Sequence, residues 1–193
     1  SFFDASRVKN VDARKQRMTL RHLLTMTAGL EWREDLPYDD PRNSCGLMEA
    51  SFDWVRFAID QPMSDEPGAR FNYNSGATQI LAHVFRRATG HDVEEYAARH
   101  LFTPLGIERW FWKRTPTGLA DTEGGLYLRP RDLAKIAFLF LKDGRWESRA
   151  IVEPGWVKDS VAPSTTVADG VRYGLKWWLI RHSGDRWAFA GSG

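Results

Sequence analysis

The chain has 193 residues, of which 42% are hydrophobic and 27% are charged, and its formal net charge is +2. These proportions are typical of a globular domain with a core of its own, and they exclude a collagen-like, coiled-coil or disordered chain. Lys and Arg are spread along the sequence without a basic block, and the apolar run 136–141 is far too short to span a bilayer. Neither nucleic acid nor a membrane is therefore expected as a partner.

Three helices are predicted in the first half of the chain. Thr19 can cap a helix that carries leucines on one side and that Gly29 would end. A shorter helix is predicted over 52–59. Residues 76–89 show the most regular helical spacing of apolar residues, and Gly90 follows as a stop signal.

Three more helices are predicted in the second half. Asp92 followed by Glu95 forms a capping-box pattern for a helix that reaches about residue 101. Pro130 suits the first turn of a helix that runs to about residue 142. Residues 154–161 are a further candidate.

Strand signals are fewer and lie late in the chain. A short strand is predicted over 126–128, and strands over 173–181 and 186–190 would form a hairpin. The sequence therefore predicts an α/β chain of the α+β type: one domain over 1–193, mostly helical over about 19–161, with a hairpin over about 171–193. Because an isolated hairpin is marginally stable, we expect it to belong to an antiparallel sheet that this chain encodes only in part.

Several common sites are excluded by their motifs. The sequence has no Gly-x-Ser-x-Gly elbow, no His-Glu-x-x-His pair, no phosphate-binding Gly-x-x-x-x-Gly-Lys and no dinucleotide fingerprint. Its five histidines show no metal-ligand spacing. No metal or organic cofactor is expected, since the chemistry that the family resemblance described below implies needs only side chains. The single cysteine, Cys45, cannot form an internal disulfide and is interpreted as a bystander.

Tyr73 and Ser75 stand at the entrance of the most regular helix. Two side chains in this position can face one cleft, and a Tyr beside a Lys ammonium could have its phenolate stabilised and act as a general base. A Tyr near a helix start is more often a packing residue, so this pair alone is a weak signal.

Five segments, in order, strengthen the functional interpretation. They resemble the serine β-lactamase and penicillin-binding-protein family, in the branch with class C β-lactamases, esterases, DD-peptidases and 6-aminohexanoate-dimer hydrolases. The segments are 19–30 (TLRHLLTMTAGL), 67–76 (PGARFNYNSG), 101–107 (LFTPLGI), 124–134 (GGLYLRPRDLA) and 173–178 (YGLKWW).

The resemblance implies a β-lactamase-like fold and a reaction in which a Ser attacks an acyl carbonyl to form an acyl-enzyme that water then cleaves. It implies proton transfer by Tyr73 and hydrogen bonding of Ser75 to a Lys and to the substrate. A third box that helps to polarise the carbonyl oxygen would fall on Gly191, Ser192 and Gly193. This box lacks the family's basic residue, which favours a small amide or ester substrate of the 6-aminohexanoate-dimer type over penicillin.

The nucleophile is the gap in this pattern. Ser6 and Lys9 fit the family's Ser-x-x-Lys box by spacing, but Ser6 lies only fifteen residues before Arg21 and in a polar stretch, where the family has a long apolar helix further upstream. We therefore expect the nucleophile outside this chain. The leading hypothesis is a parent serine hydrolase acting on amide, ester or β-lactam bonds, and the alternatives are a non-catalytic binding or sensor relative and an inactive fragment. Compartment (bacterial cytoplasm or periplasm), oligomeric state and substrate are left open.

Overall fold

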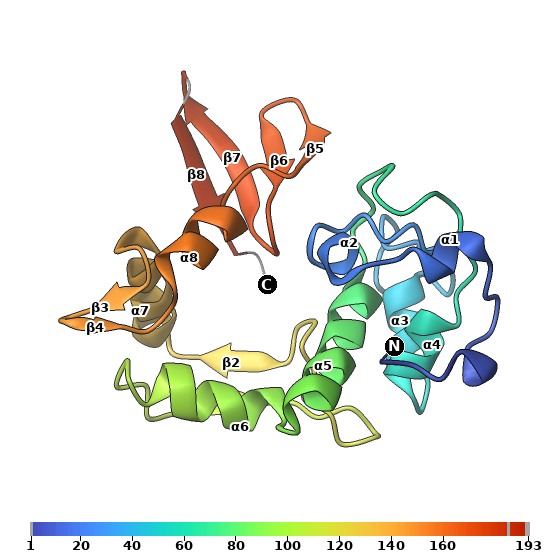
Figure 1. Ribbon diagram of the computed structural model, residues 1–193, viewed down its shortest axis with the longest axis horizontal. Helices are drawn as coiled ribbons and strands as arrows, with labels where there is room; N and C mark the ends of the chain where they lie inside the picture. The colour runs from blue at the N-terminus through green and yellow to red at the C-terminus, as the bar shows by residue number, and fades with distance from the viewer. Residues whose placement is uncertain (1, 185, 192–193) are drawn as a thin grey trace.

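The computed structural model describes residues 2–184 and 186–191. Helices dominate it, and the early helices gather on one side around the start of α5, while α7 and α8 lie on the other side (Figure 1). The helices are η1 (Ala5–Arg7), α1 (Ala13–Gln16), α2 (Leu20–Leu24), α3 (Ser44–Glu49), α4 (Trp54–Ile59), α5 (Ser75–Thr89), α6 (Val93–Ala97), the π-helix η2 (Ala98–Phe102), α7 (Pro130–Leu141) and α8 (Pro154–Ser160).

The predicted helices are present, but the one that begins after Thr19 ends at Leu24 and does not reach the predicted stop at Gly29, because Met26 already takes a left-handed conformation at φ 57°. Thr19 caps α2 by accepting from the backbone N–H of His22, and Gly90 ends α5 in the left-handed conformation at φ 76°. Asp92 caps α6 through the N–H of Glu94, so the hydrogen bond differs from the predicted capping box with Glu95. Helices α1 and α3 were not predicted, because both are short and lack a periodic apolar stripe.

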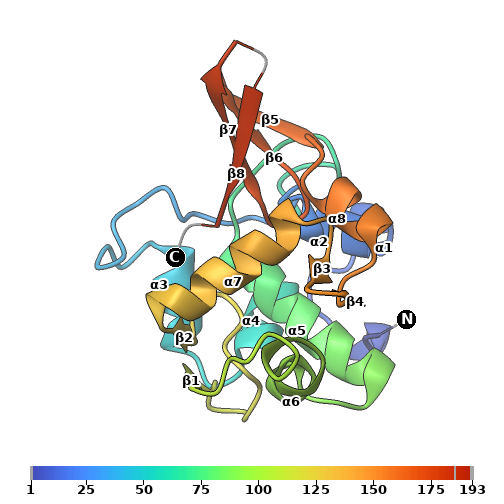
Figure 2. The ribbon, with the colours of Figure 1, turned by 90° about the vertical axis from the view of Figure 1, so that its left-hand side faces the viewer.

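Within the described residues, the strands form three antiparallel sheets. Two are small, β1 (Trp110–Trp112) with β2 (Leu126–Leu128) and β3 (Arg145–Trp146) with β4 (Arg149–Ala150). The third has four strands in the order β5-β6-β7-β8 and comprises β5 (Thr165–Ala168), β6 (Val171–Tyr173), β7 (Trp178–Ser183) and β8 (Arg186–Ala190). Figure 2 shows the β7–β8 hairpin extending away from the helices.

One predicted strand is wrong. The segment 173–181 is not continuous, since β6 ends at Tyr173 and β7 begins at Trp178. Between them the chain turns, with Lys176 at φ 68° and the N–H of Gly174 donating to the carbonyl of Trp177 at 2.8 Å. The aromatic and aliphatic residues suggested a strand throughout, but β6 and β7 pair with each other. The predicted β7–β8 hairpin is therefore one side of a sheet that two earlier strands extend.

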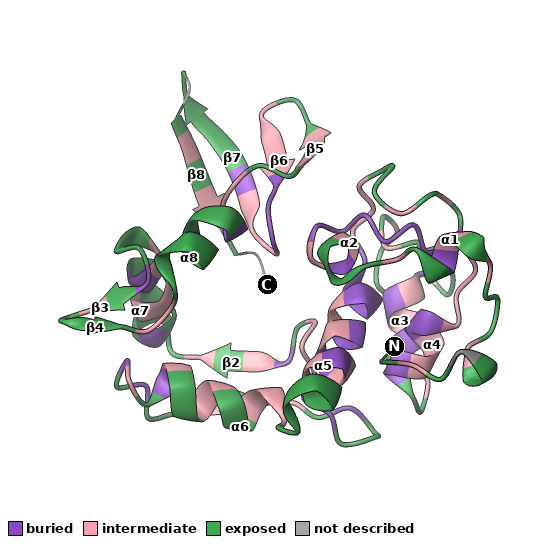
Figure 3. Ribbon diagram, in the orientation of Figure 1, coloured by how far each residue is buried: buried purple, intermediate pink, exposed green. Residues whose placement is uncertain are grey.

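Two apolar clusters are formed by the buried residues in the described part of the chain. The larger joins α2, α3, α4 and α5, and the smaller joins η2, the following turn and α7 through Phe102, Leu105, Ile107 and Leu139. Burial is concentrated on α5 and the helices beside it (Figure 3). No helix within the described residues is both long and apolar enough to cross a membrane. The larger cluster holds the N-terminal end of α5, where Tyr73 and Ser75 lie.

Candidate active site

Tyr73 and Ser75 are brought together at the N-terminal end of α5. The helix starts at Ser75 because Asn74, extended at φ −149° and ψ 100°, caps it with a side chain that accepts from the N–H of Ala77 at 2.8 Å. Ser75 is only 3% exposed, and Tyr73 is half-buried just before the helix. The backbone N–H groups of the first turn have no acceptor within the helix itself, which makes this end of the helix favourable for negative charge.

A carboxylate that the sequence analysis did not single out occupies this position. Glu34 accepts from the backbone N–H of Ser75 at 2.9 Å and from its hydroxyl at 2.7 Å. The indole N–H of Trp32 donates to the same carboxylate at 2.6 Å, and the phenol of Tyr38 donates at 3.2 Å. Glu34 lies in an irregular acidic segment between α2 and α3, where no local motif distinguishes it from its acidic neighbours.

Tyr73 lies in an environment that disfavours its ionised form. Its ring stacks on Trp178 with a centroid separation of 5.8 Å and an interplanar angle of 22°. Burial, and then the carboxylates of Glu34 and Glu123, raise the pKa of Tyr73 above its ordinary value. The phenol is therefore protonated at neutral pH, which differs from the expected phenolate stabilised by a neighbouring ammonium.

A lysine also reaches α5, from the turn between β6 and β7. The ammonium of Lys176 donates to the hydroxyl of Thr78 at 2.8 Å and lies 3.5 Å from the sulfur of Met26. Burial lowers the pKa of Lys176 to about 7, although the charge of Glu34 opposes that shift. Thr78 follows Ser75 by one helical turn on α5, so the two side chains share a face of the helix. The sequence analysis did not single out Lys176, because it lies inside the segment that was predicted to be a continuous strand.

A second acidic group borders the site near Cys45. Burial, followed by the charges of Asp121 and Glu49, raises the pKa of Glu123 to about 7. The thiol of Cys45 lies 3.9 Å from Glu123, and burial raises its pKa above the usual range. The thiol is therefore not a ready nucleophile. Across the described part of the chain, no group of three His, Cys, Asp or Glu side chains is arranged to hold a metal ion.

The predicted third box starts where the sheet approaches Tyr73. Ala190 of β8 pairs with Trp178 of β7, the residue that stacks on Tyr73. Gly191 follows directly, and a Cβ at that position would lie 3.9 Å from the Trp177 ring. Ser192 and Gly193, the rest of the predicted box, lie outside the described residues.

Ser6 and Lys9 do not form a Ser-x-x-Lys box on a helix. The 3₁₀ helix η1 ends at Arg7, so Lys9 lies beyond it. The hydroxyl of Ser6 donates to Asp4 at 2.7 Å, and the backbone N–H of Lys9 donates to Asp60 at 2.7 Å. Within the described residues, the hydrogen bonds that Ser6 and Lys9 donate are made to Asp4 and Asp60 and not to Tyr73.

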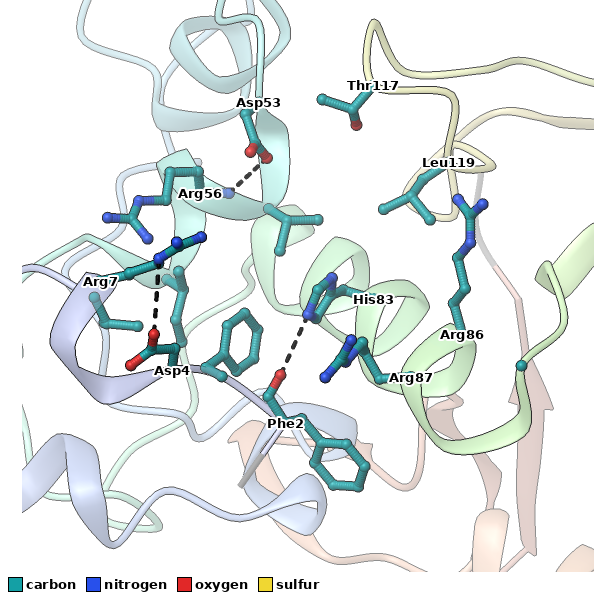
Figure 4. Close-up of a pocket in the computed structure, with 15 residues that line it drawn as sticks. Phe2, Asp4, Arg7, Asp53, Arg56, His83, Arg86, Arg87, Thr117 and Leu119 are labelled. Carbon is teal, nitrogen blue, oxygen red and sulfur yellow. Dashed lines mark hydrogen bonds and ion pairs between the residues drawn. The ribbon is translucent and has the colours of Figure 1, made fainter.

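A cavity with a volume of about 820 Å³ lies elsewhere. The N-terminal segment, α4 and the second half of α5 contribute to its lining, and Figure 4 shows Arg56, His83 and Arg86 among the lining side chains. His83 contacts the carbonyl of Phe2 at 3.4 Å. Neither Tyr73 nor Ser75 lines this cavity, so we do not assign the predicted reaction to it.

Comparisons with known proteins identify the family of the chain. The family model Beta-lactamase matches residues 6–193. The 6-aminohexanoate-dimer hydrolase of Paenarthrobacter ureafaciens is 26% identical over 151 residues, which cover 72% of this chain and 38% of the hydrolase. Monacolin J acid methylbutanoyltransferase of Aspergillus terreus is 29% identical over 106 residues, which cover 54% of this chain and 25% of the transferase.

A solved structure shows the same fold over nearly the whole chain. A Bacillus anthracis protein classed as a 6-aminohexanoate-dimer hydrolase superposes with a TM-score of 0.71 at 19% identity, covering 92% of this chain and 54% of that one. This chain thus spans only about half of that structure and less of the curated relatives. The predicted resemblance and the β-lactamase-like fold are confirmed, and the chain belongs to the Beta-lactamase family.

Proposed function

We propose that the parent protein is a serine-dependent acyl-transferring hydrolase and that this chain contributes the Tyr73–Ser75 side of its active site. The observation that carries the proposal is the convergence of Tyr73, Ser75 and Glu34 at the start of α5, with Trp178 of the sheet stacked on Tyr73. Relatives that are a hydrolase and an acyltransferase support a reaction through an acyl-enzyme.

The proposed chemistry needs a proton donor for the leaving group. A serine oxygen bonds to the acyl carbonyl carbon and gives up its proton, and the C–N or C–O bond to the leaving group breaks as that group takes a proton from Tyr73. The proton from the serine restores the phenol of Tyr73, so the step balances. Tyr73 suits the donor role because its raised pKa keeps the phenol protonated. Water then attacks the acyl-enzyme and releases the acid, while an alcohol or amine acceptor in place of water would give acyl transfer.

The substrate we propose is a small amide or ester. The segment at Gly191 lacks the basic residue of the family's third box, which is the reason to favour these bonds over the β-lactam of penicillin. The similarity to a 6-aminohexanoate-dimer hydrolase supports the amide.

The test is covalent labelling followed by turnover. The protein is incubated with a fluorophosphonate and, separately, with a penicillin, and intact mass and peptide mapping locate any adduct. One equivalent on a serine supports the proposal, and an adduct on Ser6 would identify the literal Ser-x-x-Lys as the nucleophile. Tyr73→Phe in the intact parent should lower kcat for a chromogenic ester by about 10²–10⁴-fold, the usual contribution of a positioned proton donor. An unchanged rate would refute the role of Tyr73.

A non-catalytic binding relative is the second candidate. The geometry of Ser6 and Lys9 favours it for this chain, because the hydroxyl of Ser6 is hydrogen-bonded to Asp4 and Lys9 stands outside the helix. Absence of any adduct on a folded sample of the intact parent, with no turnover, would support this candidate.

A further inference from the structure

Glu34 makes an unusual set of contacts for a single half-buried carboxylate. One oxygen accepts from the hydroxyls of Ser75 and Tyr38, and the other accepts from the backbone N–H of Ser75 and the indole N–H of Trp32. All four partners act as donors, which is the environment of an ionised carboxylate. Burial and the charge of Glu34 raise the pKa of Tyr38 to about 12, so its phenol also remains a donor.

These contacts determine how Ser75 can bind anything else. A serine hydroxyl has one proton and two lone pairs, and a carboxylate can only accept. Because the hydroxyl proton of Ser75 is directed at Glu34 at 2.7 Å, the side chain has only lone pairs left for other partners. Ser75 is thus held as a hydrogen-bond acceptor two residues after Tyr73.

The two classes of substrate differ in the group that would meet this acceptor. The leaving nitrogen of a secondary amide carries an N–H donor, whereas the leaving oxygen of an ester can only accept. A site whose polar group is left unpaired by one substrate discriminates strongly against it. We propose that Glu34 is a positioning residue that holds Ser75 as an acceptor, so that the site selects amides over the matching esters. This inference rests on the proposed function.

The test changes Ser75 from a hydrogen-bond acceptor to a hydrogen-bond donor toward the site, with little change in the shape of the side chains. In Glu34→Gln, the side-chain oxygen should remain toward the N–H groups of Ser75 and Trp32, because the opposite orientation would face an amide NH₂ with two donors. The NH₂ group then faces the hydroxyls of Ser75 and Tyr38. Ser75 accepts from it, and its own proton turns toward the site.

The assay compares a p-nitroanilide with the p-nitrophenyl ester of the same acyl group in the intact parent protein. We expect Glu34→Gln to lower the amide-to-ester ratio of kcat/KM at least tenfold, Ser75→Ala to lower it similarly, and the double variant to be no worse than either. Glu31→Gln makes the same chemical change at an exposed position and should leave the ratio unchanged. Equal losses on both substrates, or an unchanged ratio, would overturn the inference.

A second measurement separates this inference from the proposed function. Glu34→Ala, Ser75→Ala and the corresponding double variant form a double-mutant cycle in urea unfolding, which needs no activity. We expect a coupling between Glu34 and Ser75 of roughly tenfold in the unfolding equilibrium constant, since the pair is a charge-assisted hydrogen bond. Additive effects would refute the pairing itself. Coupling without turnover of either substrate would refute the proposed function, and with it the amide selectivity, while leaving Glu34 as the residue that orients Ser75.

Discussion

Replacing Glu123 with Gln should change how stability depends on pH. The carboxyl has an ordinary pKa of 4.5 and a pKa of about 7 in the folded chain, because it is buried beside Asp121 and Glu49. Between these values the folded state binds more protons than the unfolded state, so the free energy of unfolding should fall as pH rises through that window. Glutamine resembles the protonated carboxyl and cannot lose a proton, so the variant should lack this contribution.

The expected size follows from the two pKa values. If the whole pKa difference contributed to the free energy of unfolding, the effect would be at most about 3 kcal/mol. Because this half-buried side chain is partly in contact with solvent, we expect about 1–2 kcal/mol. Glu123→Gln should therefore match the wild type near pH 4.5 and exceed it by that amount at pH 8.

Urea unfolding at a series of pH values from 4.5 to 8.5 measures the difference directly, with Glu31→Gln as the exposed control. A difference between variant and wild type that stays constant across the series would refute the reasoning, because it would show that Glu123 loses its proton at the same pH in both states.

Two further substitutions test the surroundings of α5. Lys176→Gly removes a residue at positive φ and should stabilise the chain by about 1 kcal/mol at pH 7. The pKa of Lys176 is about 7 in the folded chain, and its ordinary value is 10.5. Between these values the unfolded state binds more protons, so the free energy of unfolding of the wild type should rise with pH. The stability advantage of the variant should therefore shrink by pH 10 in the same urea assay. Asn74→Ala removes the cap of α5 and should cost about 1–2 kcal/mol, or roughly 2–8 °C in the melting temperature. Asn74→Ser keeps a capping hydroxyl and should recover most of that loss, and equal melting temperatures of the alanine variant and the wild type would contradict the capping role.

Much of the local structure could be predicted because its signals lie within a few residues of each other. Thr19 before α2, Pro130 at the start of α7 and Gly90 after α5 are capping and stop signals whose physics needs only the adjoining turn. The same applies to the family resemblance, which depends on short segments in a particular order. Tyr73 and Ser75 were singled out in this way, from their place at a helix start.

The sheet was predicted less well because strand pairing is not a local property. The run 173–181 has residues suited to a strand throughout, yet Lys176 takes a left-handed conformation inside it. Its N–H donates to the carbonyl of Leu24 at 3.1 Å, and the Leu175 N–H donates to Ser160 at 2.9 Å. These partners come from α2 and α8, so the break in the strand depends on how distant segments pack.

The sequence by itself determined the positions of the main helices, the family and the placement of Tyr73 and Ser75 at the start of a helix. Only the tertiary structure decided what surrounds them. Glu34 is 41 residues from Ser75 along the chain, and Lys176 is 98 residues from Thr78. Helical periodicity and capping act over one or two turns, whereas these hydrogen bonds and the shifted pKa values arise from burial that the whole fold creates.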